Sequence, residues 1–230
     1  MPRSLVAANV LTVLLAEAEV ELAPEAIAGH PAVRQSAREQ GRKPTEILLD
    51  QNMHWQAIKL LPDGARRGRP DIVQMTLLTL LESPLNKKGQ LAVALHTRNG
   101  DLVRVRADTR LPRGEARFQG LMAKVLREGA SDDGKEPLLH VVGRMDAAAA
   151  LAAVAKGPIF RLDEGGAATT PQALAARGGD LTVVLGCFPS GAFAPAWLKA
   201  APDAASIWPE PLVAWAVAAE LSSACRAAWT

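Results

Sequence analysis

Two kinds of hydrophobic pattern alternate along most of this chain. Short apolar runs, typical of buried strands, fall at Val10–Glu21, Ile47–Asp50, Leu91–Thr97, Leu102–Ala107, Leu138–Val142, Ile159–Leu162 and Leu181–Leu185. Helix-type segments fall at Pro31–Gln40, His54–Leu61, from Pro70 to just before Pro84, Arg117–Glu128, Asp146–Ala155, Pro171–Ala176 and Leu212–Trp229. Strands that alternate with helices predict an α/β domain on a mainly parallel sheet that helices cover on both faces.

Two local signals sharpen this pattern. Pro70 in a first helical turn, followed by the carboxylate of Asp71 near the positive helix end, predicts a helix that stops before Pro84. The pair Asn99 and Gly100 between two strand-type runs predicts a tight β-hairpin. This hairpin is the antiparallel exception in the expected sheet.

Charge is distributed unevenly along the 230 residues. Residues 55–128 hold 14 of the 26 Lys and Arg but only 7 of the 24 Asp and Glu, so the rest of the chain is net acidic. Cationic side chains return at turns from Arg66 to Arg117, which predicts a rim of guanidinium groups suited to a polyanion.

Other features narrow the class of protein. No apolar run reaches the roughly 20 residues that a membrane span needs. The apolar run that ends at Leu15 leads straight into Glu17, Glu19 and Glu21, which favours a buried first strand over a secretion signal. We therefore expect a cytoplasmic protein.

The cysteines and histidines do not show the sequence spacing that is typical of a metal site. Cys187 and Cys225 lack the pair spacing of zinc sites or disulfide frameworks, so we expect two buried thiols. The four histidines are scattered; His54 and His96 could each act as a general base, but a lone histidine is more often a hydrogen-bonded structural residue, which we expect for both. We expect no metal.

The sequence Arg69-Pro70-Asp71 is the first candidate for chemistry. Because proline fixes the helix entry, Asp71 is positioned to orient Arg69, whose planar guanidinium suits a phosphate or a base edge. The alternative is structural: Asp71 caps the helix and Arg69 is a surface arginine.

Three further arginines follow at spacings of three and four. If the segment is helical, Arg113 and Arg117 share one face, and Arg110 precedes them. Contacts from these side chains to RNA phosphates would give affinity and salt dependence. A solvated basic surface is the alternative.

Two C-terminal loops are candidate ligand loops. Gly186–Phe193 follows an apolar strand, and ligands of α/β proteins bind beyond the carboxyl ends of strands. Ile207–Leu212 holds a tryptophan and two prolines, which suits an adenine pocket or simply a rigid turn. Neither loop has the spacing of a dinucleotide fingerprint or a phosphate loop.

Together these motifs resemble one family, the SPOUT-class methyltransferases that methylate N1 of a pseudouridine in small-subunit ribosomal RNA. The resemblance is dense from Leu48 to Leu126 and resumes from Val183 to Leu212. It rests on Arg66-Arg67-Gly68-Arg69-Pro70-Asp71-Ile72, Leu81-Glu82-Ser83-Pro84-Leu85-Asn86-Lys87, His96-Thr97, Arg110-Leu111-Pro112-Arg113 and Arg117-Phe118-Gln119-Gly120-Leu121-Met122.

The resemblance implies one SPOUT domain over residues 1–230, with a C-terminal trefoil knot, an exception to unknotted topology. Residues 55–128 would form an RNA-binding elaboration with the inserted hairpin and helix, and residues 156–230 the knot that binds S-adenosylmethionine. The implied cofactor residues are Leu162, Gly186, Gly191, Ala192, Phe193, Ile207, Trp208, Pro209, Glu210, Pro211 and Leu212.

The family also implies roles and partners. Arg69 and Asp71 match catalytic positions, and Arg69, Arg110, Arg113 and Arg117 match RNA-binding positions. The implied assembly is a homodimer that acts on small-subunit rRNA during ribosome biogenesis, without a metal or a membrane.

The chain departs from the family pattern at three loop positions. Cys187 stands where the family has Gly or Ala, Ser190 where it has His, and Glu210 where it has Tyr. Two other functions use the same basic surface: a ribosome-assembly factor that binds RNA with little catalysis, and a knotted methyltransferase that acts on another RNA such as tRNA.

Overall fold

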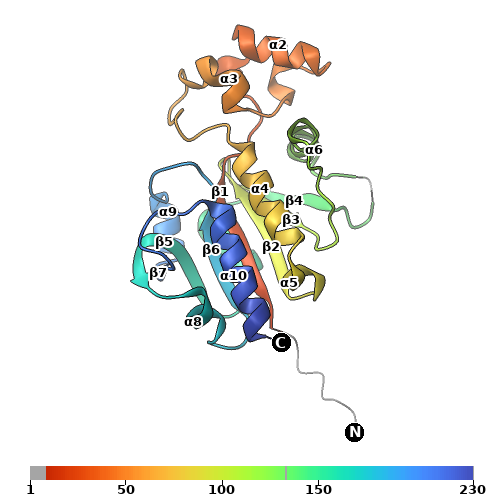
Figure 1. The fold of residues 1–230 in the computed structure, drawn as a ribbon. Helices are drawn as coiled ribbons and strands as arrows, with labels where there is room; N and C mark the ends of the chain where they lie inside the picture. The colour runs from red at the N-terminus through yellow and green to blue at the C-terminus, as the bar shows by residue number, and fades with distance from the viewer. Residues whose placement is uncertain (1–8, 133, 230) are drawn as a thin grey trace.

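The structure, a computed structural model, describes residues 9–132 and 134–229. These residues form a seven-stranded sheet in the order β4-β3-β2-β1-β6-β5-β7 (Figure 1). The strands are β1 (Leu11–Ala18), β2 (Leu91–Thr97), β3 (Asp101–Val105), β4 (Leu139–Arg144), β5 (Ile159–Ala168), β6 (Leu181–Gly186) and β7 (Ala204–Ser206). The predicted α/β class with a mainly parallel sheet is confirmed.

β1 is the centre of the sheet. It pairs in parallel with β2 and β6, so that Leu11 lies opposite both Leu91 and Leu181. β5 is parallel to β6 and β7, whereas β3 pairs antiparallel with β2 and β4. The hairpin predicted from Asn99 and Gly100 is therefore confirmed.

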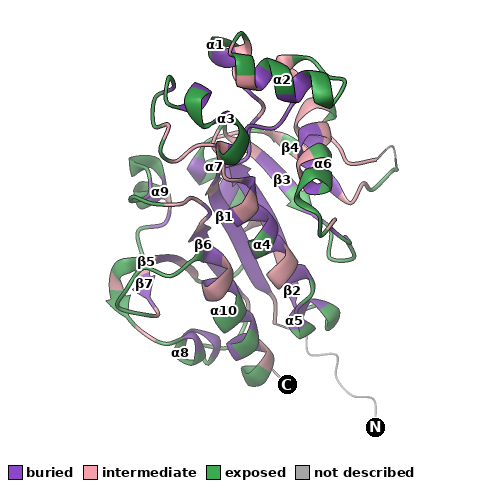
Figure 2. Ribbon diagram, turned by 45° about the horizontal axis from the view of Figure 1, so that its top comes forward, coloured by how far each residue is buried: buried purple, intermediate pink, exposed green. Residues whose placement is uncertain are grey.

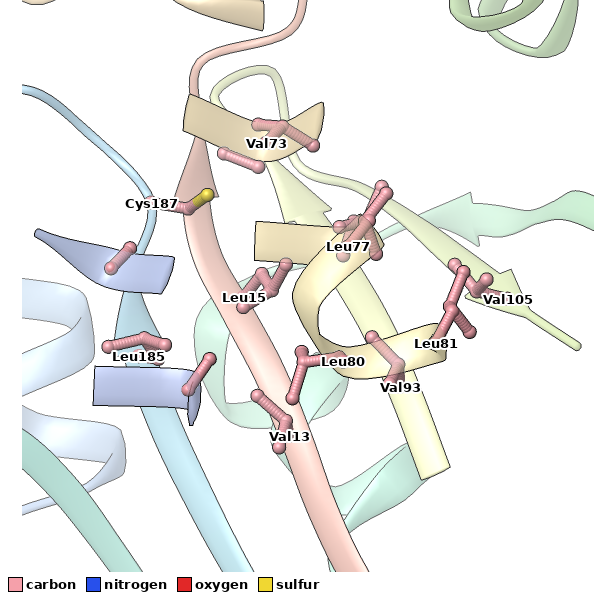
Figure 3. Close-up of a cluster of buried hydrophobic side chains, with 14 of the residues drawn as sticks. Val13, Leu15, Val73, Leu77, Leu80, Leu81, Val93, Val105, Leu185 and Cys187 are labelled. Atoms are coloured by element: carbon pink, nitrogen blue, oxygen red, sulfur yellow. The ribbon is translucent and has the colours of Figure 1, made fainter. Parts of the chain in front are cut away.

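Helices cover both faces of the sheet. On one face lie α4 (Pro70–Leu81), α5 (Pro84–Lys87), α6 (Glu115–Glu128), α8 (Pro171–Ala175) and α10 (Ala214–Ala228). The other face packs against α7 (Ala147–Val154) and α9 (Pro195–Ala200). Figure 2 shows the buried strands between these layers, and Figure 3 shows Leu77 and Leu80 of α4 beside Leu15 and Val13 of β1.

A small helical lobe follows β1 and lies at the top of the molecule in Figure 1. It consists of α1 (Glu25–Ala28), α2 (Pro31–Glu39), a 3₁₀ turn (Pro44–Glu46) and α3 (Gln51–Ile58). These elements enclose a separate core whose members are Ala23, Ile27, Val33, Ala37, Ile47, Leu49, Ala57, Ile58 and Leu61.

The predicted strand Ile47–Asp50 is wrong. Leu48 makes one antiparallel bridge to Leu22, and Ile47 and Leu49 are apolar because they fill the core of the lobe. The next helix begins at Gln51 rather than His54, since the carboxylate of Asp50 accepts a hydrogen bond from the Asn52 amide at 2.7 Å and caps it.

Two other boundaries matter for the site. α6 begins at Glu115, so Arg113 precedes the helix and the shared helical face expected for Arg113 and Arg117 does not form. α10 begins at Ala214 instead of Leu212, which leaves a longer loop before it. No helix in the part of the chain that the structure describes is long and apolar enough to cross a membrane.

Candidate functional site

A cavity of about 610 Å³ lies where β5 and β6 meet the loops that follow β6 and β7. The start of α10 closes one side, and Arg69 reaches it from the start of α4. The lining residues are Arg69, Ile72, Leu162, Asp163, Glu164, Leu185, Gly186, Phe188, Pro189, Ser190, Gly191, Ala192, Phe193, Ala205, Ser206, Ile207, Trp208, Glu210, Pro211, Leu212, Val213, Ala214, Trp215 and Val217.

The structure brings the predicted cofactor residues together around this one cavity. Ten of the eleven line it, from Leu162 on β5 to Leu212 before α10, and only Pro209 of that set does not. Sequence reasoning missed Asp163 and Glu164, which directly follow Leu162, and it placed Phe188 in the candidate loop Gly186–Phe193 without naming it as a cofactor residue.

The candidate loop Gly186–Phe193 requires glycine at its first position, which is also the last residue of β6. A Cβ at residue 186 would lie 2.7 Å from the ring of Phe188 and 3.1 Å from that of Phe193. These two rings meet edge to face, with centroids 5.3 Å apart. At the other end of the loop Gly191 has φ +86°, a left-handed backbone that favours glycine.

Cys187 points away from the cavity and into the core. Its amide donates to Ala16 O at 2.9 Å, and its carbonyl accepts from the Glu19 amide at 3.2 Å. Burial raises the pKa of the Cys187 thiol to about 12, and burial does the same for Cys225. Both cysteines are buried and free, as expected.

One side of the cavity is acidic. Asp163 accepts a hydrogen bond from the Gly165 amide at 2.9 Å and lies 3.4 Å from Arg161 Nε, while Glu164 beside it is exposed. Glu210, in the loop after β7, is a third carboxylate residue that lines the cavity. This wall complements a ligand that carries a cationic group.

Arg69 and Asp71 form a side-on ion pair at the cavity edge. Arg69 Nε donates to Asp71 Oδ1 at 2.8 Å, and Nη2 donates to Oδ2 at 2.7 Å. The hydrogen bond to Asp71 raises the pKa of Arg69, so the guanidinium stays charged. Arg69 is the N-cap residue of α4 and its side chain makes no capping hydrogen bond, while Asp71 lies in the first turn, where its charge also favours the helix.

Three of the four arginines predicted to bind RNA are exposed, and the fourth, Arg69, is partly buried. In residues 9–132 and 134–229, the side chains of Arg110, Arg113 and Arg117 make no hydrogen bond or ion pair. The backbone between them is fixed, because Gln74 Nε2 on α4 donates to the carbonyls of Pro112 and Arg113 at 2.9 and 3.1 Å. Three cations are thus free for an anionic ligand.

Other arginines of the basic region are already paired, so the expected rim is smaller than the charge count indicates. Their partners are the acidic residues at the end of β1 and just after it: Arg66 Nη2 lies 2.6 Å from Glu17, and Arg98 Nε lies 2.9 Å from Glu19. Arg67 binds Glu21 with two hydrogen bonds of 2.7 and 2.6 Å. These ion pairs join segments about 50 residues or more apart and fix the loop that carries Arg69.

The two histidines considered as bases have structural roles. His54 Nδ1 accepts from the Asp50 amide and Nε2 meets Ser36 Oγ, both at 3.0 Å, and burial lowers its pKa. His96 Nε2 lies 2.9 Å from the carbonyl of Met145. Within the described ranges, no group of three His, Cys, Asp or Glu side chains converges as a metal site.

Known proteins with similar sequences belong to one family. Residues 13–226 match the family model of the EMG1/NEP1 methyltransferases. The chain is 39% identical to the ribosomal RNA small subunit methyltransferase Nep1 of Thermococcus kodakarensis over 92% of this chain and 95% of that protein. It is 37% identical to the Nep1 of Methanothrix thermoacetophila over 92% and 93%.

A solved structure is also similar. The crystal structure of Archaeoglobus fulgidus Nep1 bound to S-adenosylhomocysteine superposes with a TM-score of 0.84. The match covers 96% of this chain and 98% of that one at 32% identity.

Proposed function

The chain belongs to the EMG1/NEP1 methyltransferase family, and from this premise we propose that it transfers a methyl group from S-adenosylmethionine to small-subunit ribosomal RNA. We further propose that the acceptor is N1 of a pseudouridine. The observation that carries the proposal is that one cavity joins the two glycine- and proline-containing loops to Arg69.

The cavity suits this cofactor in size and chemistry. Its volume of about 610 Å³ is within the range of roughly 300–1,000 Å³ for small-molecule sites. Phe188, Ile207 and Leu212 would provide apolar walls for the adenine ring, and the acidic wall at Asp163 and Glu164 would face the cationic groups. When bound, the cofactor supplies a methyl group that its sulfonium charge activates.

Arg69 and Asp71 would act on the acceptor base. Loss of the N1 proton leaves negative charge on the adjacent base carbonyls, which the Arg69 guanidinium stabilises. Asp71 fixes the orientation of the Arg69 guanidinium, since both carboxylate oxygens accept hydrogen bonds from it. This arrangement favours a positioning role for Asp71 over a role as the proton acceptor.

Arg110, Arg113 and Arg117 would hold the RNA backbone beside the cavity. A base within a stacked duplex cannot reach an enclosed methyl donor, so the target lies in a loop and turns into the site. The phosphate contacts set the position of the strand, and Arg69 meets the base that enters.

The assembly we propose is a homodimer in the cytoplasm. The loop before α10 leaves three large apolar side chains exposed, Trp208, Leu212 and Val213. A second copy of the chain would cover them. The trefoil knot that the family resemblance implies remains part of the proposal.

Methyl transfer onto a pseudouridine-containing rRNA hairpin tests the function. We expect one methyl group per hairpin and no transfer to the same hairpin with uridine, because N1 of uridine is bonded to the ribose and the ring atom in the equivalent place is a carbon, C5, with no N–H to give up. Full RNA affinity without transfer would instead favour an assembly factor. Transfer to tRNA but not to the hairpin would favour a different substrate.

A further inference from the structure

We propose that Arg66 and Glu17 form a clamp that joins the cofactor loop, residues 186–194, to the segment that carries Arg69, so that cofactor and RNA strengthen each other's binding. The inference rests on the function proposed above. It assigns a positioning role to two residues that do not line the cavity.

Arg66 contacts the cofactor loop with its guanidinium face and its edge. Nη1 donates to the carbonyl of Ala192 at 2.9 Å, and the guanidinium carbon lies 3.9 Å from the centre of the Phe188 ring. Ala192 and Phe188 both line the cavity. The position of Arg66 therefore determines the shape of one cavity wall.

Glu17 completes the clamp from the end of β1. Its Oε2 accepts from Arg66 Nη2 at 2.6 Å, and its Oε1 accepts from the Ala194 amide at 2.7 Å. Glu17 has φ +50°, an unfavourable backbone for a residue with a side chain. The contacts to Arg66 and the loop hold it in that conformation.

The neighbouring pair shows what an ordinary ion pair looks like in this segment. Arg67 presents Nε and Nη2 side by side to the two oxygens of Glu21. Arg66 instead divides its donors between Glu17 and a loop carbonyl, and its buried Nε has no hydrogen-bond partner in the described part of the chain. The geometry of Arg66 is thus set by the loop as well as by the charge.

The end of β1 links both sites through its backbone. Ala16 O accepts from the Cys187 amide at 2.9 Å at the start of the cofactor loop. Three residues on, Glu19 O accepts from the Arg69 amide at 3.2 Å. A cofactor that orders the loop therefore also orders Arg69, and by linkage RNA held at Arg69 favours cofactor binding by the same factor.

The test compares two conservative variants, Arg66→Lys and the matched control Arg67→Lys. Both keep the charge beside a glutamate, partly buried Glu17 or buried Glu21, but lysine lacks the planar fork that contacts a ring and two acceptors together. Titration calorimetry measures S-adenosylhomocysteine affinity with and without the pseudouridine hairpin. In the wild type we expect the hairpin to tighten binding about fivefold or more.

For Arg66→Lys we expect about tenfold weaker S-adenosylhomocysteine binding, the equivalent of one hydrogen bond, and loss of the hairpin effect. Arg67→Lys should match the wild type in both. Glu17→Gln, which keeps one acceptor for Ala194, should show the same loss to a smaller extent. Thermal unfolding shows that each variant is folded.

Unchanged affinity and an unchanged hairpin effect in Arg66→Lys would overturn the clamp. So would equal losses in both lysine variants, or weaker affinity that leaves the hairpin effect intact. A wild type that binds both ligands without mutual effect would overturn the clamp and leave the proposed function standing. A wild type that binds no S-adenosylhomocysteine would overturn both.

Discussion

The ion pair of Arg69 and Asp71 separates catalysis from cofactor binding. Arg69→Ala removes the cation that faces the developing charge but leaves the loops of the cavity unchanged. We expect kcat to fall about 10²- to 10³-fold, as for loss of one charge-stabilising donor, with S-adenosylhomocysteine affinity within about twofold of wild type. Single-turnover methyl transfer and titration calorimetry measure the two effects.

Asp71→Asn is the companion variant to Arg69→Ala. Its amide keeps one acceptor for Arg69, so the loss should be smaller if the carboxylate only orients the guanidinium. A loss of kcat as large as that of Arg69→Ala would indicate that Asp71 accepts the N1 proton. Collapse of cofactor binding in Arg69→Ala would contradict the separation of the two roles.

Glu19 makes stability depend on pH. Burial raises its pKa from 4.5 to about 7, although Arg98 and Arg66 lower it, and Glu21 adds to the rise. The folded chain keeps a proton that the unfolded chain has lost, so the free energy of unfolding falls as pH rises from about 4.5 through about 7. The loss is at most about 3 kcal/mol.

Urea unfolding between pH 4.5 and 8 measures this effect. Glu19→Gln should flatten the fall in unfolding free energy, whereas the exposed control Glu220→Gln should keep it. If Glu19→Gln kept the wild-type slope, another group would be responsible.

These residues also show what the sequence could reveal about the site. Arg69 and Asp71 are two positions apart at a proline-fixed helix start, so local rules predicted their contact, which the structure contains. The pairs of Arg66 with Glu17 and Arg67 with Glu21 were missed because they join segments more than 40 residues apart. The sequence signal for these pairs was the alternating series Glu17, Glu19 and Glu21 together with the cluster of arginines that begins at Arg66.

Gly120 is a weak point in α6. It is exposed in the middle of the helix, and a Cβ there would meet no atom within 4 Å. Gly120→Ala should therefore raise the free energy of unfolding by about 0.5–1 kcal/mol. Urea denaturation measures it, and Gly186→Ala, where the Cβ strikes two rings, should lower stability instead.

Arg113 precedes α6 with a free side chain on a fixed backbone. Because Gln74 holds the Arg113 carbonyl and not its guanidinium, Arg113→Ala should leave the loop in place. The plot of log affinity for the hairpin against log salt should become shallower by about 0.7–0.9. Arg177→Ala, with the same charge change beside α8, should keep the wild-type slope; a shared decrease would indicate a nonspecific charge effect.

The helices and strands that were predicted correctly are those whose sequence signal lies within a few neighbouring residues. Pro70 and the Asn99–Gly100 pair predicted α4 and the hairpin because both depend on backbone preferences of a few residues. The strand predicted at Ile47–Asp50 was wrong because a short apolar run has the same sequence pattern in a strand and in the core of a helical lobe. α9 and β7 were missed, since Pro195–Ala200 and Ala204–Ser206 are too short to show a period.

The order of strands explains why distant segments share one cavity. β1 lies between β2 and β6, so Glu17 at the end of β1 meets both the loop after β6 and an arginine before α4. The basic middle and acidic flanks of the sequence are therefore partly neutralised inside the molecule. The charge count alone could not show this, because pairing depends on the sheet order.

The proposed homodimer can be tested at the start of α10. Val213 is 48% exposed and is the N-cap residue of that helix, a position that favours aspartate. Val213→Asp should therefore separate the subunits without unfolding them, since a buried unpaired charge opposes association. Light scattering should give twice the 24.3 kDa chain mass for the wild type and the single mass for Val213→Asp. Leu60→Asp, at a 71% exposed position just after α3, should stay dimeric; if it dissociates while Val213→Asp does not, the lobe forms the interface.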